Sequence, residues 1–369
     1  MSEFRTIREL CSVVVDCPHS TPKWTTSGKI VVRNNNIKHG RIDLSSPSYT
    51  DEEHFAQRIK RAKPQPGDII ITREAPIGDV GMIPENTECC LGQRMVLLRA
   101  DQSVCDNFYL LYSLQSLYVQ HQISWSEGTG TTVSNLRIPH LEQIQIPYLP
   151  IGQQMKISSV LRSLEEKIEN NRKLNDNLQQ QAQAIYSSMF IDNPDPAWSH
   201  GHLSDLITVK YGKDHKKLAD GIYPVYGSGG IMRYVERPLY NKESVLIPRK
   251  GTLNNVMYVN QPFWSVDTMF YTEMKLPNVA KFVYHFVKAK DLASMNAGSA
   301  VPSMTTDILN AMEVVIPSAS ALEEFESLVA PMYEAMEAND VQSKALSQIR
   351  DTLLPKLMSG EIDVSDVQL

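Results

Sequence analysis

The chain contains an internal repeat, and this feature constrains its fold more than any other. Each half has a β-branched strand that ends in a basic residue, DIIITR at 68–73 and SVLIPR at 244–249. Each half also has a short segment that ends in Ile-Pro, IQIP at 144–147 and EVVIP at 313–317. A long helical pattern follows Ile-Pro both times. The sequence therefore predicts two related domains, each closed by a long helix.

Three further pairs of segments occur in the same order in both halves. They are short apolar elements (7–10 and 203–206), capped helices starting at Asp106 and Asn278, and small-residue loops (130–136 and 298–304). The numbering offset falls from 176 at the strand to 172 at the helix, 170 at Ile-Pro and 168 along the closing helix. Chance matches would scatter, whereas small loop deletions in the second copy produce such a drift. Only the early loop differs much, being about 20 residues longer in the first copy.

The composition is that of a folded protein, with 42% hydrophobic and 21% charged residues over 369 positions. The chain is too long for one ordinary core, and it has no apolar run that could span a membrane. The first residues, MSEFRTIREL, include no apolar signal core, so we expect a cytoplasmic protein. The five cysteines show no CxxC pair or zinc-ligand spacing, so we expect ordinary thiols and no metal site.

The net charge of −6 at first argues against a nucleic-acid partner, but the charge is unevenly distributed. Residues 317–369 carry three basic and ten acidic groups, which accounts for the whole excess. Residues 23–63 carry nine basic and four acidic groups, and residues 210–217 carry four lysines and one aspartate. Two local basic faces on a neutral body would serve a protein that meets DNA at two places.

The two closing helices share a heptad pattern at the constant offset of 168. The first seam consists of Ile157, Leu161, Leu164, Ile168, Asn171, Asn175, Leu178, Ala182, Ile185 and Met189; the second includes Phe325, Val329, Met332, Met336, Asn339, Leu346, Leu353 and Leu357. Such spacing keeps one seam facing a partner helix over roughly 48 Å at about 1.5 Å per residue. Pro331 should kink the second helix or delay its regular start.

Asn171, Asn175 and Asn339 occupy seam positions, and Asn171 and Asn339 fall in the same layer of the repeat. A buried Asn pair gives up stability to fix the register of a coiled coil. We therefore favour mutual antiparallel pairing, although each helix could instead pack on its own domain. The predicted class is α/β (α+β), with globular domains at 1–150 and 193–316, a spacer helix at 151–192, and a second spacer helix with a C-terminal tail at 317–369.

The sequence resembles the specificity subunits of Type I restriction-modification enzymes along nearly its whole length. Segments that carry the resemblance include GDIIITREAPIGDVGMI (67–83), the stretch from SNLRIP to AIYSSMF (134–190), KYGKDHKKLADGIYPVYGSGGI (210–231) and QIRDTLLPKLMSGEI (348–362). The resemblance implies two target-recognition domains on an antiparallel helical spacer. One domain would bind each half of a bipartite DNA site with an unspecified gap.

The resemblance also implies partners and cofactors that this chain does not supply itself. Two methyltransferase subunits would assemble around the helices and modify an adenine in each half-site, and restriction subunits would add ATP-driven translocation and cleavage. S-adenosylmethionine, ATP and Mg are expected on those partners, with no cofactor or metal in this chain. We expect the partners to contact exposed faces around Arg162, Glu165 and Arg172 and the acidic C-terminal helix, although a solvated charged face is the competing interpretation.

In the first domain, RNNNIKHGR at 33–41 is the best window for reading bases. Arginine can bind guanine O6 and N7 together, and asparagine can bind adenine in the same bidentate way. The candidates are Arg33, Asn34, Asn35, Asn36, Lys38 and Arg41. Asparagine runs are also common in turns, so a purely structural role is the alternative.

In the second domain the matching window is more basic. Its candidates are Lys210, Tyr211, Lys213, His215, Lys216 and Lys217, with Tyr226 nearby. Lysines at this density favour phosphate contacts over base reading.

Further candidates come from the repeat. Arg73 and Arg249 end equivalent strands, and either a DNA contact or an ion pair within the domain fits them. The small-residue loops add Thr131, Thr132 and Asn135 in one copy and Ser299 and Ser303 in the other, where capping is the simpler explanation.

No motif predicts catalysis. NPDP at 193–196 differs from the Asn-Pro-Pro-aromatic motif of adenine methyltransferases at its third residue, Asp195, and no glycine-rich cofactor loop precedes it. The glycines at 128–130 and 227–230 lack the spacing of phosphate loops. We therefore predict a non-catalytic, sequence-specific DNA-binding subunit; the alternative is a scaffold with two modules that does not bind DNA.

Overall fold

The computed structural model describes residues 3–38, 40–125, 135–295 and 303–364. It divides into two compact units: unit 1 comprises Met1–Asn170 and Val341–Leu369, and unit 2 comprises Asn171–Asp340. The boundary between the units falls inside each of the two long helices, α6 (Ile151–Ser187) and α10 (Ala319–Ser359). A π-helical turn at Ser188–Asp192 extends α6.

Unit 1 is built around a six-stranded sheet in the order β2-β10-β7-β8-β5-β4. These strands are β2 (Cys11–Asp16), β10 (Met95–Ala100), β7 (Ile69–Thr72), β8 (Val80–Met82), β5 (Gly40–Ile42) and β4 (Ile37–Lys38). A second sheet pairs β6 (Ser48–Thr50), β3 (Lys29–Val32) and β9 (Cys89–Leu91), and a third pairs β1 (Glu3–Thr6) with β11 (Gln145–Tyr148).

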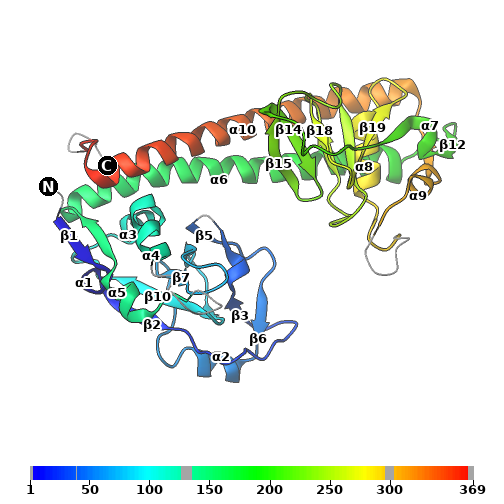
Figure 1. Cartoon of the computed structure of the whole chain (residues 1–369). Coiled ribbons are helices and arrows are strands. Elements are labelled where there is room, and N and C mark those ends of the chain that lie inside the picture. The colour runs from blue at the N-terminus through cyan, green and yellow to red at the C-terminus, as the bar shows by residue number, and fades with distance from the viewer. Residues whose placement is uncertain (1–2, 39, 126–134, 296–302, 365–369) are drawn as a thin grey trace. The chain divides into compact units, whose positions relative to one another are not determined.

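The helices of unit 1 are short apart from the long pair. They are α1 (Ile7–Leu10), α2 (Glu52–Arg58), α3 (Asn107–Gln115), α4 (Leu117–Trp125) and α5 (Ile138–Gln143), with a 3-10 turn at Asn34–Asn36. The predicted start of α3 is confirmed, because the Asp106 carboxylate accepts the Tyr109 N–H at 2.9 Å as an N-cap. Ile157 and Leu161 of α6 and Leu357 of α10 are buried in the same core as Tyr109. In Figure 1, α3 lies beside the first part of α6.

Unit 2 repeats this topology. Its sheets are β13-β19-β16-β17, β15-β14-β18 and β12-β20. The strands are β12 (Ser199–His202), β13 (Ile207–Tyr211), β14 (Asp220–Gly227), β15 (Gly230–Val235), β16 (Ser244–Pro248), β17 (Met257–Val259), β18 (Trp264–Ser265), β19 (Met269–Met274) and β20 (Glu313–Ile316). Its short helices are α7 (Leu203–Leu206), α8 (Ala280–Lys288) and α9 (Thr306–Asn310). Tyr186, Phe282 and Phe325 pack together in its core.

The strand pairings confirm the internal repeat. The order β2-β10-β7-β8 corresponds to β13-β19-β16-β17, and both units pair two strands in parallel, β3 with β9 and β14 with β18. The β2–β7 connection (17–68) has 52 residues and the β13–β16 connection (212–243) has 32, so the longer early loop of the first copy is confirmed.

The structure corrects one predicted helix start and excludes a delayed start for the second long helix. Helix α8 begins after Val279 and not at Asn278, which adopts a left-handed φ of 58° that cannot start a helix. Helix α10 runs through Pro331 from Ala319, so its regular start is not delayed. One proline removes a single backbone hydrogen bond, and the burial of Phe325 and Val329, which both precede Pro331, holds this part of the helix against the core of unit 2.

Across the described ranges, no helix is both long and apolar enough to cross a membrane.

Candidate nucleic-acid interface

The ends of strands β7 and β16 are built by the same backbone contacts in the two units. Leu136 donates its N–H to the Arg73 carbonyl at 3.0 Å, and Met304 donates to the Arg249 carbonyl at 2.9 Å. Arg73 and Arg249 directly follow these strands, so the residues after them, Glu74 and Lys250, are equivalent. The turn then continues through Ala75 and Gly251, which both have positive φ (44° and 88°).

Strand register places several predicted segments at this end of each sheet. In unit 1, Thr72 of β7 lies opposite Met95, and Asp16 of β2 lies opposite Val96. In unit 2, Tyr211 of β13 and Ile247 of β16 both lie opposite Phe270. Since the segments after β2 and β13 emerge where β7 and β16 end, residues 210–217 share this end with Arg249.

Arg73 forms an ion pair inside unit 1. Its Nη1 lies 2.8 Å from Asp16 Oδ2, its Nε donates to the Leu136 carbonyl at 2.9 Å, and its side chain is only 11% exposed. This is the ion-pair alternative that the sequence left open. Arg249 is less enclosed: its guanidinium lies 5.5 Å from the centre of the Tyr211 ring, and its Nη1 donates to the Asp267 carbonyl at 3.1 Å. A cationic group over an aromatic ring holds the arginine in place while leaving other donors available.

Glu74 gathers polar side chains from three segments, and it was not among the predicted residues. Its backbone carbonyl accepts the Asn34 amide at 2.9 Å, its Oε1 accepts the Asn135 amide at 2.8 Å, and its Oε2 lies 3.2 Å from Arg94 Nε. We call Asn34, Arg73, Glu74, Arg94 and Asn135 the β7-end cluster. The sequence signal for Glu74 was its place directly after the basic strand end in the repeat, whereas no signal pointed to Arg94.

Two amide oxygens of the β7-end cluster lack hydrogen-bond partners. Asn34 Oδ1 and Asn135 Oδ1 are both buried without one among the described residues. A buried unpaired acceptor costs about 1–3 kcal/mol, so each of these oxygens requires a donor such as water or a ligand.

The 33–41 window divides between exposed and structural positions. Arg33 is exposed and lies over the Trp24 ring at 5.0 Å, and Asn35 is also exposed. Asn36 is buried, with Oδ1 accepting the Arg33 N–H at 2.9 Å and Nδ2 donating to the Asp43 carbonyl at 2.9 Å. The turn interpretation thus accounts for Asn36. Lys38 is exposed and pairs with Asp43 at 2.8 Å.

Arg41 belongs to an ion-pair network at the helices. Within unit 1, its Nη2 lies 2.7 Å from Glu165 Oε2 and its Nη1 lies 2.7 Å from Glu169 Oε2. Arg350 of α10 lies 2.6 Å from the other Glu165 oxygen. The expectation that Glu165 lies on an exposed face is wrong, since its side chain is 14% exposed and turned toward two arginines. The same contact explains why Arg350 stands at a seam position.

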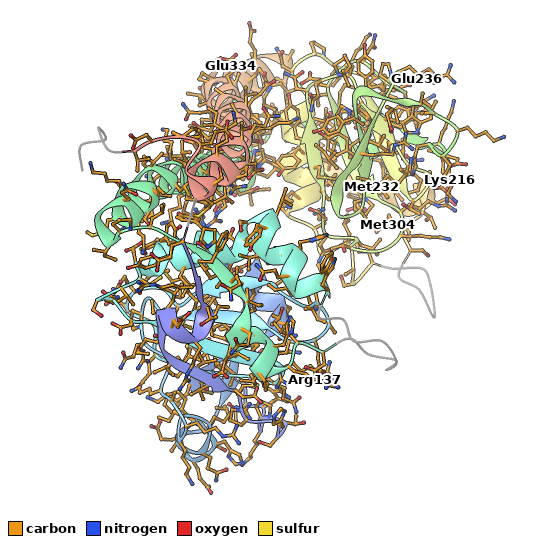
Figure 2. The ribbon with its side chains drawn as sticks, turned by 60° about the vertical axis from the view of Figure 1, so that its left-hand side comes forward. Arg137, Lys216, Met232, Glu236, Met304 and Glu334 are labelled. Carbon is orange, nitrogen blue, oxygen red and sulfur yellow. The ribbon has the colours of Figure 1, made fainter. Side chains whose placement is uncertain are left out.

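The second window is open and basic. Lys213, Lys216 and Lys217 are exposed, and Figure 2 shows the Lys216 side chain at the periphery of unit 2. Lys210 lies 3.6 Å from Glu273, and His215 is partly buried with Nδ1 lacking a hydrogen-bond partner. Tyr226 is buried, and its hydroxyl accepts from Gln261 at 3.2 Å.

In unit 2, the equivalent of the β7-end cluster comprises Tyr211, Lys213, Arg249, Lys250 and Ser303, and we call it the β16-end cluster. Lys250 and Ser303 form an isolated backbone bridge. The predicted residues Thr131, Thr132 and Ser299 lie outside the described residues.

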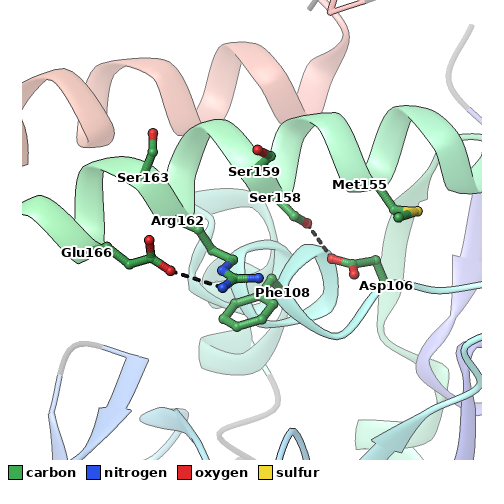
Figure 3. A pocket seen from close by; sticks show the side chains of 8 residues that line it. All are labelled: Asp106, Phe108, Met155, Ser158, Ser159, Arg162, Ser163 and Glu166. Atoms are coloured by element: carbon green, nitrogen blue, oxygen red, sulfur yellow. Dashed lines mark hydrogen bonds and ion pairs between the residues drawn. The ribbon is translucent and has the colours of Figure 1, made fainter. Parts of the chain in front are cut away.

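A groove of about 390 Å³ runs along α6 in unit 1 (Figure 3). Its lining residues are Asp106, Phe108, Met155, Ser158, Ser159, Arg162, Ser163 and Glu166. The Arg162 guanidinium lies over the Phe108 ring at 4.3 Å and pairs with Glu166 at 3.0 Å. The Ser158 hydroxyl donates to Asp106 Oδ1 at 2.5 Å, and the same carboxylate oxygen accepts the Tyr109 N–H, so this contact belongs to the cap of α3.

Within the described part of the chain, no group of His, Cys, Asp and Glu is arranged to hold a metal ion. The five cysteines are free and buried, and burial raises the pKa of the Cys11 and Cys89 thiols to about 12. Such thiols stay protonated and unreactive at neutral pH.

Comparison with known proteins defines the class of protein to which this fold and these clusters belong. The family model described as "Type I restriction modification DNA specificity domain" matches residues 2–180 and 197–325, one match for each half of the repeat. The chain belongs to this family, the specificity subunits of Type I restriction-modification systems, which are non-catalytic and direct partner enzymes.

Individual relatives agree with this assignment. The chain is 25% identical to the Type I restriction enzyme MjaIX specificity subunit of Methanocaldococcus jannaschii, over 82% of this chain and 79% of that protein. It is 34% identical to the HindI specificity subunit of Haemophilus influenzae over 25% of this chain and 18% of that protein. The crystal structure of a Type I restriction-modification S subunit from M. genitalium has the same fold, with a TM-score of 0.60 at 21% identity, covering 97% of this chain and 96% of that one.

Proposed function

We propose that this chain reads a bipartite DNA site, with the β7-end cluster facing one half-site and the β16-end cluster facing the other. The observation that carries the proposal is the repetition of one fold in which equivalent strand ends gather exposed or unpaired polar groups. Arginine, asparagine and lysine are the side chains that bind base edges and phosphates. The function of the chain is then to select the sequence, while partner subunits act on it.

Helices α6 and α10 would form an antiparallel coiled coil that sets the gap between half-sites. Within unit 2, the Asn171 amide donates to the Asn339 carbonyl at 3.3 Å and Asn339 Nδ2 donates to Asn175 Oδ1 at 2.8 Å. Within unit 1, Glu165 pairs with Arg350. Along these contacts the residue numbers on α6 rise while those of the contacting residues on α10 fall, as antiparallel packing requires. A rod of roughly 48 Å at about 1.5 Å per residue matches one to one-and-a-half DNA turns of about 34–36 Å.

The partners would be two methyltransferase subunits, which modify adenine, and restriction subunits, which translocate and cleave DNA. S-adenosylmethionine, ATP and Mg would bind to those partners. Arg162 and Arg172 are 47% and 62% exposed on α6 and would contact a methyltransferase subunit, with the groove of Figure 3 beside the first of them. The internal repeat would let two copies of one partner bind equivalently.

Methylome sequencing tests this proposal. The gene is expressed with a cognate methyltransferase gene in a strain that lacks other adenine methylation. We expect a bipartite motif with a fixed gap and methyladenine in both halves, and we expect deletion of this gene alone to remove it. Unchanged methylation after the deletion would favour the alternative, a scaffold of two modules that does not bind DNA.

A further inference from the structure

The equivalent residues Glu74 and Lys250 carry opposite charges at the same point of the repeated fold. Their equivalence rests on the matched backbone bonds to Arg73 and Arg249 and on the left-handed residue that follows each of them. The preceding residue is arginine in both units, so the difference begins at this position. A site that meets two unlike half-sites needs such a difference.

Glu74 is poised to accept hydrogen bonds beyond those it already makes. One carboxylate oxygen accepts a hydrogen bond from the Asn135 amide, and the other forms an ion pair with Arg94. An ionised carboxylate offers about four acceptor positions, so two remain. Its side chain is 24% exposed, which leaves a path to a ligand.

A carboxylate is unfavourable beside DNA unless it meets a donor, because phosphates repel it. The donors on base edges in the major groove are the amino groups of cytosine N4 and adenine N6. Arg94, 56% exposed, offsets the charge of Glu74 and retains donors of its own.

Lys250 has the complementary chemistry. It is exposed, and no acidic side chain pairs with it among the described residues of unit 2. The ammonium group can only donate, and guanine O6 and N7 are the acceptors that lysine recognises in the major groove.

We propose that Glu74 and Lys250 are specificity-determining residues of opposite hydrogen-bonding sense. Glu74 accepts from a cytosine or adenine amino group in one half-site, and Lys250 donates to a guanine in the other. This inference rests on the proposed function and adds to it the base-edge chemistry that each unit selects.

The test uses the full chain assembled with its methyltransferase subunit and a panel of duplexes. Each duplex carries the methylated motif with one base pair replaced, and fluorescence anisotropy gives its affinity relative to the intact motif. We expect Glu74→Gln to reduce discrimination about 10-fold or more at one C·G or A·T pair of one half-site, leaving the other half-site unchanged. Lys250→Met should do the same at one G·C pair of the other half-site.

Matched controls are Glu85→Gln and Lys242→Met. Both residues are exposed and lie at the opposite ends of the same sheets, Glu85 after β8 and Lys242 before β16. They should leave every discrimination ratio unchanged. Glu74→Asp, which keeps the charge but shortens the side chain, should also lose discrimination, and it provides a second variant if Glu74→Gln folds poorly.

Two results for the Glu74 and Lys250 variants would overturn the inference. One is a ratio of affinities for intact and altered motifs that stays within twofold of the wild-type ratio at every position. The other is an equal loss of affinity for all duplexes. The second would mean that Glu74 only holds Asn135 and Arg94 in place. A wild-type complex with no sequence preference would instead overturn the proposed function itself, so the two failures are distinct.

Discussion

The imidazole of His285 is fully buried in unit 2, between residues of α6 and α10. Its Nδ1 lies 2.8 Å from Gln183 Oε1, so it donates, and its Nε2 lies 3.0 Å from the Tyr333 hydroxyl, so it accepts. These contacts need the neutral ring. Burial lowers the pKa of His285 to about 4 from an ordinary value of 6.5.

This buried histidine makes stability depend on pH. The unfolded chain takes up a proton as the pH falls through about 6.5, whereas the folded chain resists protonation until about 4. The stability is therefore complete above pH 6.5 and is lost as the pH falls from 6.5 toward 4, with a total on the order of 3 kcal/mol. The free energy of unfolding, measured by urea titration, should fall between pH 7 and pH 5. His285→Gln should make this fall smaller. The exposed His121 provides the control, and an identical slope in His285→Gln would contradict the assignment.

Residue roles at the strand ends were only partly predictable from the sequence. The repeat identified Arg73 and Arg249 as equivalent, but could not distinguish the enclosed ion pair of Arg73 with Asp16 from the more open placement of Arg249. Asp16 precedes Arg73 by 57 positions and lies on another strand, so their ion pair depends on how β2 and β7 are aligned with β10. Glu74 was missed because the sequence argument selected basic, amide and hydroxyl side chains, and its contacts to Asn34 and Asn135 depend on the tertiary structure.

At the scale of elements, the asparagine seam of unit 2 ties α6 to α10. Asn175 Nδ2 donates to the Met336 carbonyl at 3.1 Å and to Asp340 Oδ1 at 2.8 Å, while its Oδ1 accepts from Asn339. The heptad spacing predicted which positions share the seam. It predicted a contact between Asn171 and Asn339, but not the second contact between Asn175 and Asn339. That contact depends on side-chain length and on the axial displacement of one helix relative to the other.

Because Asn175 and Asn339 satisfy each other, their replacements should not be additive. Asn175→Ala or Asn339→Ala leaves a partner unpaired and should each lower the free energy of unfolding by about 1–3 kcal/mol. The double variant should lose clearly less than the sum, with a coupling energy of about 0.5 kcal/mol or more. Denaturant titration of the four proteins measures it. The exposed pair Arg172 and Asp176, 3.0 Å apart on α6, should couple by only about 0.3–0.5 kcal/mol. Additive effects at the two asparagines would mean that their bond contributes nothing.

At the scale of the whole molecule, the order of elements was largely predictable from the sequence. Strands at DIIITR and SVLIPR, the Ile-Pro strands and the long helices all form where the repeat placed them. The pairing of β3 with β9 and of β14 with β18 was not predictable, because these parallel strands are joined by long connections whose return path depends on tertiary packing. The division of the described chain into units that each include parts of both long helices likewise comes from contacts far apart in sequence.

The uneven charge of the molecule leads to a prediction about its affinity for DNA in general. The whole chain has a net charge of −6, yet Lys213, Lys216 and Lys217 are exposed at the end of the sheet that also bears Arg249. If these lysines bind phosphates, each releases counterions and contributes about 0.9 to the slope of log affinity against log salt. Replacing all three with alanine should reduce the slope by up to about 2.7 and weaken binding equally for cognate and unrelated duplexes. The assembled complex, titrated with DNA at several salt concentrations, gives both quantities.

Lys242→Ala, at the opposite end of β16, should leave the slope unchanged. A wild-type slope in the triple variant would exclude these lysines from the interface, and a loss confined to the cognate duplex would assign them to base reading.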